Sequence, residues 1–84
     1  MCRNITTLRG LEPPATQQEI EASARQYVRK VTGVQKPSAS SDVAFEAAVA
    51  AVALITDHVL RELPPRRQVP TTVPPLRRLA KKFE

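Results

Sequence analysis

The sequence predicts a small all-α protein: a helical hairpin closed by the N-terminal segment and followed by a disordered, basic, proline-rich tail. Three observations predict this class. Apolar residues recur with the helical period in two stretches, and helix-start and helix-stop residues bracket both stretches. Five of the eight prolines fall within residues 64–84. With 84 residues, the chain is one small domain that buries roughly 60 % of its unfolded surface.

The first helix is predicted over residues 16–33. Thr16 and Glu19 form a capping-box pattern, in which each side chain satisfies a backbone amide of the other residue. Gly33 is placed to end the helix in the left-handed conformation. The apolar stripe that we expect to face the core comprises Ile20, Ala24, Tyr27, Val28 and Val31.

The second helix is predicted from about residue 41 to residue 63. Ser41 and the polar residues around it favour a helix start, and Pro64 and Pro65 end the helix. The short link 34–40 folds the two helices into an antiparallel hairpin. We expect Phe45 to pack against Tyr27 or Val31 across the hairpin. The expected stripe comprises Phe45, Val49, Val52, Ile55, Thr56, Val59, Leu60 and Leu63.

The first fifteen residues are the third element of the predicted core. Ile5, Leu8 and Leu11 are their main apolar residues, and both a short helical turn and an extended segment fit the pattern. If this segment did not pack, the hairpin would have to dimerise, so a monomer and a homodimer both stay open. No uninterrupted run of about eighteen apolar residues occurs, and we expect no membrane association.

The basic character of the chain is concentrated at its C-terminal end. Residues 1–63 sum to zero net charge, whereas residues 64–84 hold six cations against Glu84 and carry the whole net charge of +5. This asymmetry divides the chain into a helical domain, 1–63, and a basic proline-rich tail, 64–84, which we expect to be dispensable for folding. Such a tail attracts polyanions weakly and without sequence preference. The candidate anion-binding residues are Arg66, Arg67, Arg77, Arg78, Lys81 and Lys82 in the tail, and Arg25, Arg29 and Lys30 where the first helix ends.

The N-terminus is the one candidate for thiol chemistry. Removal of Met1 would leave a free amine and the thiol of Cys2 on one residue, with Arg3 and Asn4 as supporting groups. The alternative is a simple terminal cysteine. One Cys and one His cannot build a zinc cage, and His58 reads as a surface residue of the second helix. We therefore predict no catalytic residue, no cofactor and no metal site.

Several motifs together resemble the bacterial family DUF2277, a domain of unknown function. They are MCRNI at the N-terminus, LEPPAT before the first helix, QYVRKVTG at its end, KPS in the link and AFEAAV in the second helix. The tail stretch PPRRQVPTTVPPLRR is also similar to some members. The resemblance implies a small cytoplasmic bacterial protein and brings no known activity, cofactor or catalytic residue.

Taken together, these features favour a non-enzymatic binding or adaptor protein. Its helical domain would bind a protein partner, and its tail an anionic one. Two alternatives stay open: a thiol- or metal-dependent activity centred on Cys2, and a non-specific nucleic acid-associated protein.

Overall fold

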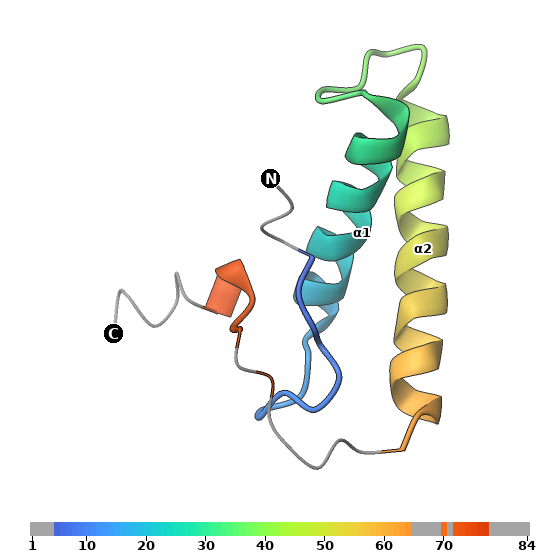
Figure 1. The fold of residues 1–84 in the computed structure, drawn as a ribbon. Helices are drawn as coiled ribbons and strands as arrows, with labels where there is room; N and C mark the ends of the chain where they lie inside the picture. The colour runs from blue at the N-terminus through green and yellow to red at the C-terminus, as the bar shows by residue number, and fades with distance from the viewer. Residues whose placement is uncertain (1–4, 65–69, 71, 78–84) are drawn as a thin grey trace.

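The computed structural model describes residues 5–64, 70 and 72–77, and this part of the chain is all-α, as predicted. Helix α1 spans Gln17–Thr32 and helix α2 spans Asp42–Glu62. The two helices lie side by side and antiparallel, joined by the short link at one end of the hairpin (Figure 1). A helical turn at residues 75–77 lies beside the opposite end.

Both ends of α1 are formed as the sequence predicts. The Glu19 amide donates to Thr16 Oγ1 over 3.1 Å, and Glu19 Oε1 accepts from the Thr16 amide over 2.8 Å. At the other end, Gly33 adopts a φ of 73°, which only glycine adopts readily, and its amide donates to the Arg29 carbonyl. The capping box and the glycine therefore fix the length of α1.

Helix α2 begins after Ser41 and ends before the Leu63–Pro64 step. The Ser41 hydroxyl makes no capping bond to the helix and instead accepts from the Ser38 amide over 3.1 Å, which holds the link together. Leu63 is already extended, with a ψ of 146°, because the proline that follows disfavours the helical conformation. The predicted boundaries are confirmed to within one residue.

The core lies between the two helices and the N-terminal segment. Leu8 and Leu11 are 8 % and 4 % exposed, which confirms that this segment closes the hairpin. The segment is not helical: it bends at Gly10, whose φ is 89°, and the Leu11 amide reaches the Leu8 carbonyl. The remaining core residues are Ile20, Ala24 and Val28 of α1 and Phe45, Val49 and Ala53 of α2.

Some residues of the predicted apolar stripes of α1 and α2 are exposed rather than buried. Phe45 is buried as expected, but Tyr27 and Val31 are 48 % and 64 % exposed, so neither belongs to the buried core, and their packing against Phe45 stays a prediction. Ile55 is likewise 65 % exposed, and Ala53 is buried in its place. The reason is that the described part of the chain covers only a narrow row of residues on each helix.

The described part of the tail returns to the beginning of α1. Pro70 and Pro74 are buried, and Arg77 contacts Glu19 with two nitrogens. This stretch therefore packs on the helical domain, whereas the sequence favoured a mostly disordered tail that is dispensable for folding. The division into residues 1–63 and 64–84 stays a prediction, and the rest of the tail lies outside the described residues.

Helix α2 is long and apolar enough to cross a membrane by length and composition, with a mean hydropathy of 1.8 over an 18-residue window. The uninterrupted-run criterion did not detect it because Glu46 and Asp57 interrupt the apolar residues. One such helix is weak evidence for a membrane span, so the predicted lack of membrane association stays a prediction.

Candidate functional site

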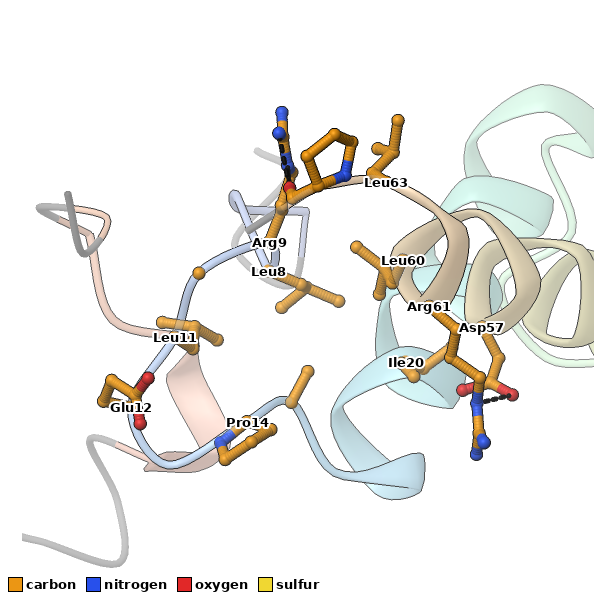
Figure 2. A pocket seen from close by; sticks show the side chains of 13 residues that line it. Leu8, Arg9, Leu11, Glu12, Pro14, Ile20, Asp57, Leu60, Arg61 and Leu63 are labelled. Carbon is orange, nitrogen blue, oxygen red and sulfur yellow. Dashed lines mark hydrogen bonds and ion pairs between the residues drawn. The ribbon is translucent and has the colours of Figure 1, made fainter. Parts of the chain in front are cut away.

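A concavity lies between the loop at residues 8–15 and the second half of α2 (Figure 2). Its volume is about 400 Å³, within the range of about 300–1,000 Å³ that is typical of ligand pockets. Three chain segments build it: the N-terminal segment, the first turn of α1 and the last turns of α2. Its walls comprise Leu8, Arg9, Gly10, Leu11, Glu12, Pro14, Ala15, Ile20, Asp57, Leu60, Arg61, Leu63 and Pro64.

The floor of this pocket is apolar. Leu8 and Ile20 are core residues, at 8 % and 3 % exposed, and Leu60 packs against the same core. Figure 2 shows Leu8, Leu60 and Ile20 converging on the space between the loop and α2. The floor therefore presents an apolar surface to any group that enters the pocket.

The rim of the pocket carries two positive and two negative side chains. Arg9 donates to the Pro64 carbonyl from Nε over 2.9 Å and from Nη2 over 2.6 Å, which ties the N-terminal segment to the end of α2. Arg61 Nε lies 3.0 Å from Asp57 Oδ2, and Glu12 is exposed. Because these charges balance, the rim does not select for a charged ligand.

A second, smaller pocket of about 310 Å³ lies on the other side of Leu8 and Leu60, which line both pockets. Its lining is mostly apolar and includes Ile5, Thr6 and Tyr27. Among the described residues, the Thr6 hydroxyl is buried here without a hydrogen-bond partner. The predicted functional N-terminus, Cys2, Arg3 and Asn4, lies outside the described residues, and the described chain begins at Ile5 in the wall of this pocket.

Of the three candidate anion-binding cations of α1, Arg25 is already paired within the hairpin. Arg25 is engaged by Glu46 of α2 through two hydrogen bonds of 2.7 and 2.8 Å, and its guanidinium lies 5.8 Å from the centre of the Phe45 ring. The hydrogen bonds from Arg25 lower the pKa of Glu46. Arg29 is half-buried with its Nε unpartnered among the described residues, and Lys30 is exposed.

Of the six predicted tail cations, only Arg77 is described, and it makes an ion pair. Its Nη2 and Nε lie 2.9 and 3.0 Å from the two oxygens of Glu19, and Nη2 also donates to the Pro14 carbonyl. Burial raises the pKa of Glu19, but hydrogen bonds from Arg77 and from Thr16 outweigh burial and leave the pKa lowered. Arg66, Arg67, Arg78, Lys81 and Lys82 lie outside the described residues.

Sequence reasoning detected neither the pocket nor the Glu19–Arg77 pair. The capping box already accounts for the position of Glu19 in the sequence, so nothing in the sequence pointed to a second partner. The pocket arises where three segments that are distant in the sequence meet. No group of three or more potential metal-binding side chains occurs in the described part of the chain. His58 is exposed on α2, as predicted.

Comparison with known proteins gives a family and no function. A family model described as an uncharacterized conserved protein (DUF2277) matches residues 1–83. Neither a curated protein nor a solved structure matches this chain.

Proposed function

We propose that this chain, which belongs to the DUF2277 family of uncharacterized conserved proteins, is a non-enzymatic binding protein. Its pocket between the N-terminal segment and the end of α2 receives an apolar side chain from a protein partner. The observation that carries this proposal is the combination of an apolar floor with a charge-balanced rim.

The chemistry of the walls supports a side chain rather than a small charged metabolite. Arg9 is occupied by the Pro64 carbonyl and Arg61 by Asp57, so neither guanidinium is free to bind an anion in a bidentate manner. Burying one leucine-sized side chain on Leu8, Ile20 and Leu60 contributes about 1.5–3 kcal/mol. The exposed rim then provides polar contacts for the backbone on either side of that residue.

The test is selection from a random peptide library followed by mapping of the bound peptide by methyl NMR. Peptides with one large apolar residue are expected, and they should shift the methyl signals of Leu8, Leu60 and Leu63. Ala15→Phe would fill the half-buried wall of the pocket and abolish binding. The matched control, Ala39→Phe, changes an exposed alanine in the link and should leave binding intact. Peptides that shift signals elsewhere, or that bind the Ala15→Phe variant equally well, would contradict the proposal.

The basic tail supports a second, weaker binding role. Six cations fall within residues 64–84, and an anionic partner such as nucleic acid is attracted to them without sequence selection. This role concerns a different part of the chain and does not depend on the pocket.

A further inference from the structure

The face of α2 turned away from α1 is apolar and uncovered by the described part of the chain. Val43, Leu54 and Ile55 are 81 %, 56 % and 65 % exposed. From residue 47 to residue 56 the helix has no charged side chain. Only 17 % of the apolar window of this helix is buried. So large an unpartnered apolar surface on a small protein marks an interaction site.

One line of exposed residues along this face of α2 is sorted by size. Residues 44, 47, 51, 54, 58 and 61 alternate at spacings of three and four, which is the spacing of a helix–helix seam. The first half of this seam presents small side chains, Ala44, Ala47 and Ala51, and the second half presents larger ones, Leu54, His58 and Arg61, all of them exposed.

We propose that this face binds a second copy of the same chain, with the two α2 helices packed antiparallel about a two-fold axis near their midpoint. Full overlap of the helices, which span 42–62, places each residue opposite one whose number adds to about 104–105. Ala51 then faces the partner subunit's Leu54, and Ala47 faces the partner subunit's His58. In this register each larger side chain of the seam meets an alanine, which is the condition for close packing.

A parallel arrangement does not give this match. It would place Ala47 on Ala47 and Leu54 on Leu54, leaving a gap in the first half while crowding the second. The antiparallel register is also the one that overlaps the full length of both helices. Size complementarity and overlap therefore select the same geometry.

The macrodipoles of α2 also agree with the antiparallel register. Antiparallel packing brings opposite macrodipoles alongside each other, whereas parallel packing aligns them.

A lipid surface is the competing occupant, and the hairpin argues against it. Glu46 and Asp57 bound the apolar stretch, and Glu46 is held by Arg25 of α1 through two hydrogen bonds. Insertion of α2 across a bilayer would carry this ion pair into hydrocarbon or would separate the helices. A second copy covers the same face and leaves the pair in water.

The first experiment measures the mass of the full chain by sedimentation equilibrium from micromolar to millimolar concentration. We expect a concentration-dependent dimer that becomes monomeric throughout this range in the Ala51→Glu variant, because each copy then brings a carboxylate into the seam. Val31→Glu places the same charge on an exposed position of α1 and should dimerise normally. Circular dichroism confirms that both variants are folded. A wild-type chain that stays monomeric, or an Ala51→Glu variant that still dimerises, would overturn the proposal.

The second experiment tests the register in a Cys2→Ser background. Chains carrying Ala51→Cys are mixed with chains carrying Leu54→Cys and oxidised. Antiparallel packing predicts that the mixed disulfide predominates, whereas a parallel dimer would give each homodisulfide instead and would refute the two-fold geometry. Flotation with phosphatidylcholine–phosphatidylglycerol vesicles completes the test. Binding of a monomer to these vesicles would assign the face to lipid and overturn the proposal.

Discussion

Glu19 combines two roles that are usually separate. As the third residue of α1 it completes the capping box, a role that an exposed carboxylate performs equally well. Here its side chain is only 4 % exposed and accepts hydrogen bonds from Nε and Nη2 of Arg77. A buried carboxylate requires a partner that cancels its desolvation, and Arg77 is that partner. The pair therefore links the start of α1 to a residue 58 positions further along the chain.

Replacing Arg77 by alanine should destabilise the protein by about 1–3 kcal/mol, because it leaves a buried carboxylate without its charged partner. Replacing Glu19 by glutamine should cost less, since the amide keeps a hydrogen-bonding oxygen and carries no charge. Chemical denaturation of both single variants and of the double variant measures the coupling. Additive effects would show that the pair contributes no interaction energy of its own.

The same pair predicts the acid dependence of stability. The pKa of Glu19 in the folded protein lies below its ordinary value of 4.5, so its contribution to stability is fully present above that value. The contribution is lost as the pH falls through the lowered pKa, where the carboxyl protonates and the ion pair breaks. Stability of the wild-type chain should therefore decline more steeply below about pH 4.5 than that of Glu19→Gln. Parallel declines in the two proteins would assign acid sensitivity to other carboxylates.

At the scale of the helices, Phe45 is expected to dominate the packing of α2 on α1. It is 5 % exposed and, among the described residues, is the only aromatic one in the buried core. Phe45→Ala should cost about 3–5 kcal/mol, a large share of the stability of so small a domain. Val31→Ala, on the same hairpin but at a 64 % exposed position, should change stability by less than about 0.5 kcal/mol. Thermal and urea unfolding followed by circular dichroism give both values.

The helices themselves could be predicted from the sequence because their signals are local. Thr16, Glu19 and Gly33 act within one turn of the helix that they bound, and Pro64 ends α2 through its own ring. The match to the family is also confirmed, since the resemblance rests on short motifs along the chain. The helix ends and the family motifs are both properties of residues close together in the sequence, so both can be predicted from the sequence.

The width of the core and the position of the pocket could not be predicted in the same way. Tyr27, Val31 and Ile55 fit the helical period, but whether such a residue is buried depends on a neighbouring element, and the described part of the chain leaves all three exposed. The pocket depends on the bend at Gly10 and on the bond from Arg9 to Pro64, contacts between residues 55 positions apart. Periodicity carries no information about such contacts.

At the scale of the whole molecule, the described tail is expected to contribute to folding. A chain ending at Pro64 lacks Arg77 and the buried Pro70 and Pro74, so it should unfold at a lower temperature than the full chain. Its loss of stability should be at least that of Arg77→Ala, since it removes the same ion pair and further apolar contacts. Equal stability of the truncated and full chains would restore the simpler expectation that the tail is dispensable.

Two neighbouring arginines of the tail, Arg77 and Arg78, are expected to contribute differently to polyanion binding. The whole net charge of +5 belongs to residues 64–84, so binding to DNA or RNA should be weak, about 10⁻⁴–10⁻⁶ M at physiological salt, and should lack sequence preference. Each arginine that contacts a phosphate contributes about 1 to the salt dependence of the binding constant. Arg78→Ala should therefore reduce that slope by about 1. Arg77→Ala should leave it nearly unchanged, because the Arg77 charge is already neutralised by Glu19.

The measurement is a titration of a labelled duplex at several salt concentrations, with the two single variants compared side by side. Removing Arg66, Arg67 and Arg78 together should lower the slope by about 3. If Arg77→Ala lowered the slope as much as Arg78→Ala, the nucleic acid would have to compete with Glu19 for the guanidinium. Binding would then open the contact between the tail and α1, and the stability of the helical domain would fall as polyanion is added. A single duplex bound far more tightly than others would instead require a fixed reading surface, which a charge-driven tail does not provide.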